Sequence, residues 1–491
     1  MTSADHIWPV IVIGSGPTGS AAAILLAQQG VPVLVLDRWS DVYPQPRAVH
    51  LDDEVFRILA RMQLAESFAD ISRPGLGLQL VDRTGRILGR VARLPEASCH
   101  GYPQANMYDQ PELEQLLRQR MAALPEITFR GNVEVIDLNL DPDGKYRVIV
   151  QDRDSGETQC LNATYVLGAD GANSIVRSKI GTSLEPLNFE QRWLVVDGEV
   201  DQELGHWEGV HQVCDDRRAG TYMRIGDTRH RWEFQLLPTE TCDDFSSFEQ
   251  LRPLLDPWIG TALPDAITIV RTAEYTFRAA VADQWREANV FLLGDAAHLT
   301  PPFIGQGLGS GLRDAENLAW KLARVLRGEL DVSVLESYEQ ERKPHARALI
   351  HIARLMGVAM TGGGRAGSRV RRALLPPLTK VLSHVEFIGR GATPRLEPSH
   401  LVDYENDKLS GALAPNLVRG ILLDAEIGGR WACLSSTAIA PSLSVEFSRL
   451  GCAVRELELG DEIQMWLAGA KVSAVLVRPD GYVMASGEPV D

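Results

Sequence analysis

The stretch IGSGPTGS, residues 13–20, holds three glycines, Gly14, Gly16 and Gly19, in the spacing G-x-G-x-x-G. Glycines at this spacing let the backbone turn tightly and approach a pyrophosphate without a Cβ in the way. The apolar run at 10–13 predicts a buried parallel strand, and residues 21–29 predict a helix closed by Gly30. A strand, a glycine turn and a helix N-terminus in this order indicate a dinucleotide-binding unit.

An acidic residue after the second strand strengthens this interpretation. The apolar segment 32–36 predicts a strand, and Asp37 follows it, about 20 residues after the glycine turn. A carboxylate there can accept hydrogen bonds from the ribose hydroxyls of a dinucleotide. The alternative is a glycine-rich turn that holds no ligand. The strand, helix and acid together favour a bound dinucleotide, either NAD(P) or FAD.

Length, composition and charge bound the class of protein. A chain of 491 residues, 45% hydrophobic and 23% charged, is typical of a soluble globular protein of about three domains. The net charge of −16 argues against nucleic-acid partners and anionic membrane surfaces, since both favour clustered Lys and Arg. The N-terminal segment lacks the pattern of a signal peptide, and no apolar run approaches about 18 residues. We therefore expect a cytoplasmic protein without a membrane partner.

The cysteines predict neither a disulfide scaffold nor a metal site. Six are scattered along the chain without a C-x-x-C pair: Cys99, Cys160, Cys214, Cys242, Cys433 and Cys452. This distribution favours reduced structural thiols, and no metal is expected.

The pattern of predicted secondary structure changes twice along the chain. From 185 to 285 short alternating strands replace the pattern of strands and helices, and at 290 a buried strand followed by a long amphipathic helix restores it. We predict an α/β fold in which 1–184 and 286–400 form one discontinuous dinucleotide-binding domain. The segment 185–285 then forms an inserted antiparallel sheet that binds substrate, and 411–491 forms a small C-terminal α/β domain. Because no second G-x-G-x-x-G occurs, one permanently bound dinucleotide is expected, which favours FAD.

Two further motifs make the prediction more specific. DGANSIVR occupies 170–177, and GDAAH occupies 294–298, directly after a predicted strand. With the glycine turn, they resemble the class A FAD-dependent aromatic monooxygenases related to para-hydroxybenzoate hydroxylase, and within them the hydroxyphenylpropionate and polyketide hydroxylase branch. The resemblance implies a Rossmann-like FAD-binding domain and a thioredoxin-like C-terminal domain. The absence of C-x-x-C from 411–491 gives no support to a redox role for that domain.

The resemblance and the glycine turn together give a set of residues expected to contact FAD. Asp295 is expected to accept hydrogen bonds from the ribityl hydroxyls, and the helix that opens at Gly307 to turn its amides toward the flavin. The alternatives are that Asp295 caps a helix and that Asp170 belongs to an ordinary turn. The expected FAD-binding residues are Gly14, Gly16, Pro17, Thr18, Gly19, Asp37, Arg38, Arg47, Gln110, Asp170, Asp295, Pro302, Gly305, Gly307 and Leu308. Gly309 departs from the family, where many members carry an asparagine.

For the reaction, the resemblance implies that NADPH or NADH reduces FAD, that O2 adds to the flavin as a hydroperoxide, and that an aromatic ring is hydroxylated. Pro302 is expected beside the reactive flavin face. The candidates for a proton acceptor are His50, His206, His211 and Tyr222. Tyr222, Trp232 and Phe234 are expected to contact the substrate, with plain core packing as the alternative.

Other functions stay open at this stage. The flavin could serve epoxidation or reduction, or the chain could be a non-catalytic flavin-binding protein. The partners expected are a small aromatic substrate and O2. The identity of the substrate, the choice between NADPH and NADH, and the formation of a homodimer are left open by the sequence.

Overall fold

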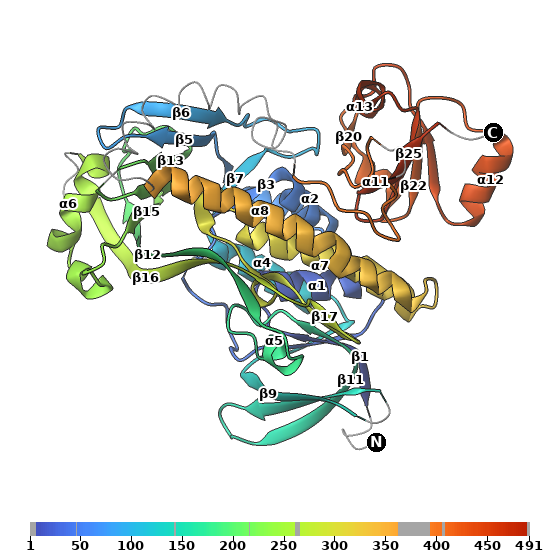
Figure 1. Cartoon of the computed structure of the whole chain (residues 1–491), viewed down its shortest axis with the longest axis horizontal. Helices are drawn as coiled ribbons and strands as arrows, with labels where there is room; N and C mark the ends of the chain where they lie inside the picture. The colour runs from blue at the N-terminus through green and yellow to red at the C-terminus, as the bar shows by residue number, and fades with distance from the viewer. Residues whose placement is uncertain are drawn as a thin grey trace.

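The structure is a computed structural model, which describes residues 6–45, 47–141, 144–215, 217–260, 266–361, 393–404 and 408–488. The part of the predicted dinucleotide-binding domain at 362–392 lies outside these residues. Figure 1 shows the chain extended along one axis, with the C-terminal unit at one end and an antiparallel sheet at the other. Among the helices that the structure describes, none has both the length and the apolarity to cross a membrane.

A sheet of eight strands forms the centre of the molecule, in the order β17-β18-β11-β1-β2-β8, with β10 added beside β11 and β9 beside β10. The pairs β18-β11, β11-β1, β1-β2 and β2-β8 are parallel. Parallel strands of this kind are buried on both faces, and Val10, Ile11 and Val12 are fully buried here. The bounds are β1 Ile7–Ile13, β2 Val33–Leu36, β8 Ile127–Arg130, β9 Val133–Leu140, β10 Tyr146–Asp152, β11 Thr158–Gly168, β17 Arg286–Glu287 and β18 Val290–Leu292.

Helices cover this sheet and complete a Rossmann-like α/β fold. The helix α1 packs between α4 and α7, and its residues from Gly19 to Ala27 are buried, so it has no polar face. It begins at Pro17, four residues earlier than predicted, because proline fits the first turn of a helix, where its missing N–H costs no hydrogen bond. The bounds are α1 Pro17–Ala27, α2 Asp53–Arg61, α3 Ala65–Ile71, α4 Gln110–Ala122, α5 Ile175–Lys179, α7 Gly307–Leu326 and α8 Ser337–Thr361.

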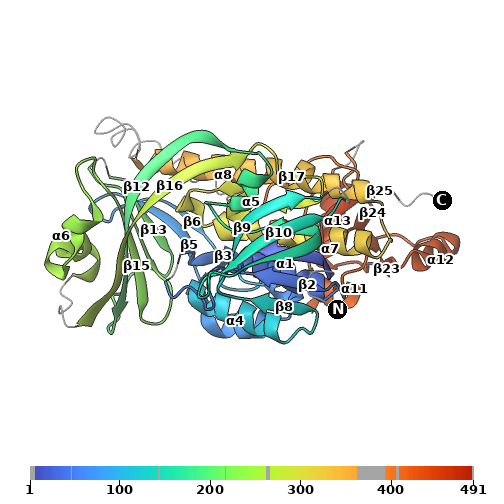
Figure 2. The same cartoon turned by 90° about the horizontal axis from the view of Figure 1, so that it is seen from below.

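A second sheet of eight strands lies at one end of the molecule, in the order β19-β16-β12-β15-β14-β13-β5-β6. The long strands β12 and β16 run from the central region into this sheet (Figure 2). It recruits β5, β6 and β19 from outside 185–285, and β5 pairs in parallel with β13. The bounds are β5 Gly77–Val81, β6 Ile87–Ala92, β12 Leu184–Val200, β13 Val210–Val213, β14 Gly220–Arg224, β15 Arg229–Gln235, β16 Ile267–Ala282 and β19 His298–Leu299.

One face of the second sheet is covered by α6, Phe248–Ile259, which begins with a capping box of Ser247 and Gln250. A separate three-stranded antiparallel sheet pairs β3 His50–Asp52 and β4 Ser72–Pro74 with β7 Ala105–Tyr108. Short 3-10 turns complete the elements at η1 Cys242–Phe245, η3 Gly294–Ala296, η4 Pro302–Ile304 and η5 Val332–Glu336.

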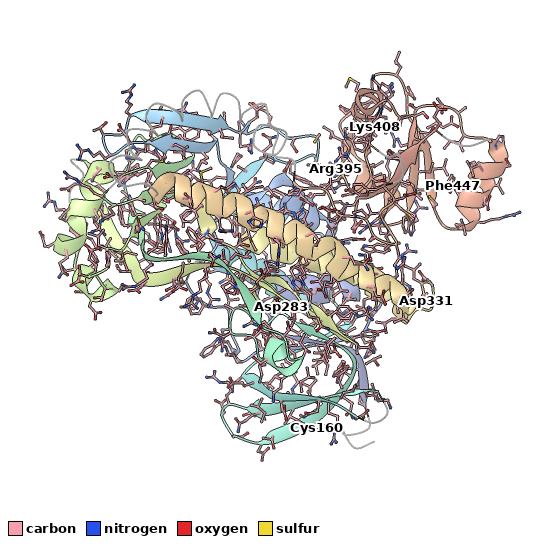
Figure 3. All side chains as sticks on the ribbon, in the orientation of Figure 1. Cys160, Asp283, Asp331, Arg395, Lys408 and Phe447 are labelled. Carbon is pink, nitrogen blue, oxygen red and sulfur yellow. The ribbon has the colours of Figure 1, made fainter. Side chains whose placement is uncertain are left out.

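The C-terminal unit has its own four-stranded sheet and its own apolar core. Its bounds are β20 Leu417–Val418, β21 Ile421–Leu422, α11 Leu423–Ile427, β22 Ala432–Ser435, α12 Pro441–Arg449, β23 Ala453–Glu456, α13 Glu462–Ala470, β24 Ala474–Val477 and β25 Val483–Gly487. It contains Cys433 and Cys452, whereas Cys160 lies on β11 of the central sheet (Figure 3).

Buried ion pairs join the C-terminal unit to the central helices. Asp424 accepts hydrogen bonds from Arg57 and Arg61 of α2, and Arg478 donates to Glu341 of α8. These charges are nearly enclosed, and removing one partner of such a pair leaves an uncompensated buried charge, which costs about 3–5 kcal/mol. The C-terminal unit is therefore attached firmly to the rest of the chain.

Candidate functional site

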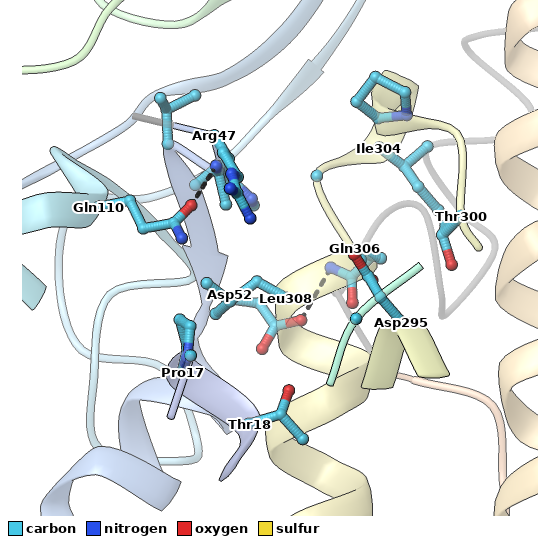
Figure 4. Close-up of a pocket in the computed structure, with 18 of the residues that line it drawn as sticks. Pro17, Thr18, Arg47, Asp52, Gln110, Asp295, Thr300, Ile304, Gln306 and Leu308 are labelled. Atoms are coloured by element: carbon cyan, nitrogen blue, oxygen red, sulfur yellow. Dashed lines mark hydrogen bonds between the residues drawn. The ribbon is translucent and has the colours of Figure 1, made fainter. Parts of the chain in front are cut away.

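One cavity of about 1060 Å³ runs from the glycine loop of the central sheet to a face of the antiparallel sheet. Single ligand pockets usually hold about 300–1,000 Å³, so the volume of this cavity is at the upper end of that range. Figure 4 shows its wall near the glycine loop, with Pro17 and Thr18 facing Asp295 and Leu308 from opposite elements. It contains nearly all of the residues predicted to contact FAD, from Gly14 to Leu308.

The glycine loop is tight where the prediction requires it. Gly14 has φ +97°, and a Cβ there would overlap the carbonyl oxygen of Ala169. A Cβ on Gly19 would overlap the carbonyl oxygen of Gly14, and Gly19 is not among the cavity-lining residues, so its role is close packing. Gly16 is the N-cap of α1 and supplies no side-chain cap, which leaves the first amides of the helix free for an anion.

Asp37 holds the loop as well as facing the cavity. Its carboxylate accepts hydrogen bonds from the backbone N–H of Ser15 at 2.6 Å and of Trp39 at 2.8 Å. Arg38, the next residue, lines the cavity too. A substitution at Asp37 would therefore disturb the shape of the loop in addition to any contact with a ligand.

Asp170 is committed to the local structure. Its carboxylate accepts from Ser174 Oγ at 2.5 Å and from the N–H of Ile175 and Val176 at 2.7 and 3.1 Å, which satisfies the first turn of α5. The residue lines the cavity, and burial raises the pKa of its carboxyl. These hydrogen bonds are local ones, as the ordinary-turn alternative for Asp170 described, and they also cap α5.

Asp295 has a different environment. Its carboxylate faces the cavity and has no hydrogen-bond partner among the residues that the structure describes. Desolvation by the cavity wall raises the pKa of this carboxyl, opposed by His298 and Arg47. Asp314, from α7, fixes the loop that carries it, because it accepts from the N–H of Gly294 at 3.0 Å and pairs with His298 at 2.8 Å. The loop thus holds the carboxylate of Asp295 in a fixed position, where it can accept hydrogen bonds from a ligand.

Arg47 and Gln110 form the opposite wall (Figure 4). Gln110 Oε1 accepts from the N–H of Ala48 at 2.6 Å, and its Nε2 donates to Glu114 at 2.6 Å. The carbonyl of Arg47 accepts from Arg231 Nη1 at 2.7 Å, which ties the wall to the antiparallel sheet. Both predicted residues thus border the space that a ligand bound in this cavity would occupy.

The loop before α7 closes the third side, with Pro302, Gly305, Gly307 and Leu308 lining the cavity. Gly305 has φ +64°, and a Cβ there would lie 2.7 Å from His50 Nδ1. His50 itself lines the cavity, and burial lowers its pKa, so the neutral imidazole is favoured. The side chain of His50 and the backbone of Gly305 therefore fit together only without a Cβ.

A buried ion network supports this loop, and it was not predicted. Gln306 Nε2 donates to Asp52 at 2.9 Å (Figure 4), and Arg313 of α7 contacts Asp52, Glu54 and Gln306 at 2.6, 2.6 and 3.0 Å. A Cβ on Gly309 would lie 2.9 Å from Arg313 Nη1, so a larger residue at that departure from the family has little room. The pattern of acids at 52–54 was the only available signal.

The antiparallel sheet presents the face opposite to the one predicted. Gln212, Thr221, Met223, Arg231 and Glu233 line the cavity. Tyr222, Trp232 and Phe234 alternate with them and pack in an apolar cluster with α6, as the core-packing alternative described. Because neighbouring residues of a strand point to opposite faces, choosing the aromatic residues selected the wrong face.

His211 and Tyr222, which were predicted to take part in catalysis, also face away from the cavity, for the same reason. His211 is paired with Gln79 at 2.7 Å and with the carbonyl of Trp207 at 2.8 Å, and Tyr222 OH contacts His230 Nδ1 at 3.0 Å. Neither lines the cavity, nor does His206, which contacts the carbonyl of Trp258 at 2.7 Å. Of the residues predicted to take part in catalysis, His50 and Pro302 lie at the cavity.

The geometry fits FAD. A glycine cradle that a Cβ would fill, uncapped amides at α1, and an acceptor without donors at Asp295 match a pyrophosphate and a polyhydroxyl chain. The residues that would hold FAD come from separate segments of the chain, between Gly14 and Leu308, which explains why no single motif defines the site.

Comparisons with known proteins agree. The family described as "FAD binding domain" matches residues 8–353. A protein of Rhodococcus jostii named "Probable NADH-specific resorcinol 4-hydroxylase" is 31% identical over 96% of this chain and 91% of its own length. A 3-(3-hydroxy-phenyl)propionate/3-hydroxycinnamic acid hydroxylase of Burkholderia vietnamiensis is 34% identical over 74% of this chain and 66% of its own length.

Solved structures share the fold over nearly the whole chain. Aklavinone-11 hydroxylase, in complex with FAD and aklavinone, matches with a TM-score of 0.82 at 22% identity, covering 98% of this chain and 96% of its own. The flavin-dependent monooxygenase PieE, in complex with FAD and substrate, matches with a TM-score of 0.81 at 23% identity, covering 99% and 96%. Together with the match over residues 8–353, these similarities show that the chain belongs to the FAD-binding-domain family of flavin-dependent aromatic hydroxylases.

Proposed function

We propose that this enzyme is an FAD-dependent monooxygenase that consumes NADPH or NADH and hydroxylates a phenolic or other aromatic substrate. The balanced reaction oxidises one NADPH or NADH to NADP+ or NAD+, consumes one O2 and one proton, inserts one oxygen atom into a C–H bond of the ring, and releases the other oxygen atom as water. When bound, FAD supplies the redox chemistry, because it accepts a hydride and, once reduced, activates O2.

The observation that carries this proposal is the continuity of one cavity between two kinds of wall. The end at Gly14, Asp37 and Asp295 has polar acceptors and free amides, as a dinucleotide requires. The other end is lined mainly by apolar residues of the antiparallel sheet, the Pro302–Ile304 turn and α8, which suits an aromatic ring: Leu78, Leu80, Val91, Val210, Met223, Phe303 and Met356.

The residues have distinct proposed roles. The glycine loop, Asp37 and Arg38 hold the pyrophosphate and ribose, Asp295 orients the ribityl chain, and Arg47 and Gln110 support the opposite side. Pro302, Gly305, Gly307 and Leu308 form a rigid wall beside the flavin ring. The enclosing sheet would exclude water from the site, so that O2 activated by bound FAD would react with the substrate.

We propose that each of the two large sheets binds a different ligand. The central sheet with its helices binds FAD, and the antiparallel sheet contributes the substrate side of the cavity. The C-terminal unit, for which we propose a thioredoxin-like fold, has a structural role. Its contacts with α2 and α8 support this, because α8 and Asp52, the N-cap of α2, line the cavity.

The test is coupled turnover with phenols. The holoprotein is mixed with NADH or NADPH and with resorcinol or 3-(3-hydroxyphenyl)propionate, and nucleotide oxidation and product mass are followed. A phenol that stimulates oxidation and gains one oxygen atom supports the proposal. A protein that holds FAD but is stimulated by no phenol or related aromatic compound would point to a carrier, and a reduced or epoxidised product to another flavin reaction.

A further inference from the structure

We propose that Glu233 is the catalytic base of this site and accepts the proton of the substrate's ring hydroxyl during hydroxylation. The proposal rests on the proposed function, since it assigns a residue to the activation of the same phenolic substrate. Glu233 is not among the residues predicted from the sequence.

Glu233 reaches the cavity from β15 by the alternation of that strand. Its neighbours Trp232 and Phe234 pack toward α6, so the side chain of Glu233 lies on the cavity face and lines the cavity. The residue is 7% exposed, and its carboxylate has no hydrogen-bond partner among the residues that the structure describes. A buried acceptor without a partner is costly, so such groups in native proteins call for an explanation, and a ligand is one.

The cation closest in the strand does not neutralise Glu233 by direct pairing. Arg231 lies two residues away on the same face, but its Nε and Nη2 contact Asp197 at 2.7 and 3.1 Å, and its Nη1 donates to the carbonyl of Arg47. Arg271 lies on the far side of Asp197, with its Nε 3.6 Å from that carboxylate. The three charges Arg231, Asp197 and Arg271 thus form a group of their own, and Glu233 stays available.

A polar row places Glu233 near the wall proposed to border the flavin. Glu233 is directly opposite Thr221 on β14, which is directly opposite Gln212 on β13, and all three line the cavity. Gln212 Nε2 donates to the carbonyl of Phe303 at 2.7 Å, which holds the row against the Pro302–Ile304 turn. Gln212 Oε1 is buried and without a partner in the described part of the chain. A ring hydroxyl at this row would therefore lie close to the flavin wall.

The chemistry of the step is a simple proton transfer. The O–H bond of the phenol breaks, its electron pair stays on the phenol oxygen, and the proton forms the O–H of the Glu233 carboxylic acid. The phenolate is more electron-rich than the phenol and reacts faster with an electrophilic oxygen. After hydroxylation the proton returns to the oxygen of the product, so Glu233 is ionised again and no oxidant beyond O2 is required.

The environment tunes Glu233 for this step. Burial raises its pKa to about 7, with Arg231 acting to lower the pKa and Asp197 to raise it. The uncharged Thr221 faces it from β14, and Val195 is its partner on β12. A carboxylate with this pKa is a better match to a phenol, whose pKa is about 10, than an ordinary glutamate.

The test compares Glu233→Gln with the parent holoenzyme, using whichever of resorcinol or 3-(3-hydroxyphenyl)propionate the parent hydroxylates. Positioned general bases contribute about 100- to 10,000-fold, so we expect kcat for hydroxylation to fall by about that factor, with a smaller change in KM. The parent's rate should rise with pH through a limb near 7, and the variant should lose this limb. Its rate should recover only as pH approaches the pKa of the free phenol.

Two other variants serve as controls for Glu233→Gln. Glu190→Gln, on β12, removes a carboxylate from an exposed pair with Arg278 of β16, outside the cavity lining, and should keep the parent's pH profile. Glu233→Asp keeps a carboxylate, so the pH limb should persist with a partial loss of rate, and it carries the test if Glu233→Gln does not retain FAD. A parent that hydroxylates no phenol would overturn the proposed function. A parent that is active, with Glu233→Gln showing the parent's kcat and pH limb, would overturn the role of Glu233 alone.

Discussion

Tyr482, in the C-terminal unit, donates a hydrogen bond from its phenolic oxygen to Glu54 in the first turn of α2. Glu54 in turn accepts from Arg313, and Arg313 donates to Gln306, the N-cap of α7 at the cavity wall. A chain of buried polar contacts thus connects the last part of the sequence with the loop proposed to border the flavin.

This connection predicts the effect of Tyr482→Phe. The substitution leaves an oxygen of buried Glu54 without its donor, a loss of about 1–3 kcal/mol. We expect the protein to unfold and to release FAD at a lower temperature than the parent. The release of FAD is measured by the increase in flavin fluorescence. Tyr146→Phe is the control, since that hydroxyl donates only to the carbonyl of Glu287 in the central sheet. Equal effects of the two substitutions would mean that the connection does not support the cofactor loop.

Asp295 should contribute directly to FAD binding. Asp295→Ala removes the acceptor that we assign to the ribityl hydroxyls, and we expect FAD to bind about 1–3 kcal/mol more weakly, measured by titration of the apoprotein. Asp283→Ala, at an exposed position on the surface (Figure 3), serves as control. Asp37→Ala is a less clean test, because Asp37 also holds the amides of Ser15 and Trp39. Unchanged affinity in Asp295→Ala would remove Asp295 from the site.

Gly305 should tolerate no side chain. Gly305→Ala adds a Cβ that would lie 2.7 Å from His50 Nδ1, on a backbone with φ +64°. Gly328→Ala isolates the backbone cost, since Gly328 has φ +71° with no atom near its Cβ position. That cost is about 1–2 kcal/mol at either position. We expect Gly305→Ala to lose more FAD affinity than Gly328→Ala, and a matching loss would show that the contact with His50 is unimportant.

The thiols of the C-terminal unit should have no part in turnover. Cys433 and Cys452 lie in one buried cluster, and burial raises the pKa of Cys433 to about 11, so the reactive thiolate is scarce at neutral pH. The double variant Cys433→Ser, Cys452→Ser should therefore keep the parent's nucleotide oxidation and its yield of hydroxylated product. A collapse of hydroxylation with FAD content intact would assign these thiols to the chemistry.

The sequence predicted the part of the site that depends on local backbone geometry. The glycine loop, Asp37 and the GDAAH segment each follow a buried strand, so strand, turn and spacing are enough to bring Gly14 and Asp295 to one edge of the central sheet. These positions are set by short-range chemistry, which a single sequence carries.

The substrate side was predicted less well, because it depends on which face of each strand turns inward. Trp232 and Glu233 are neighbours, and either face of β15 had residues that could bury. Only the packing of α6 on Trp232 and Phe234 decides the matter, and that contact is not local in sequence. The Arg313 network could not be predicted either, because Arg313 is separated from Asp52 and Glu54 by more than 250 residues.

The central claim is that this cavity holds one FAD and inserts one atom of O2 into an aromatic ring. The most direct measurement is the mass of the product formed by the FAD-loaded protein from a phenol and reduced nicotinamide cofactor under heavy-isotope O2. We predict a product that has gained a single heavy oxygen atom, with the other atom appearing in water. Nucleotide oxidation that yields hydrogen peroxide and unchanged phenol for every substrate tested, or a product whose new oxygen comes from water, would contradict the account.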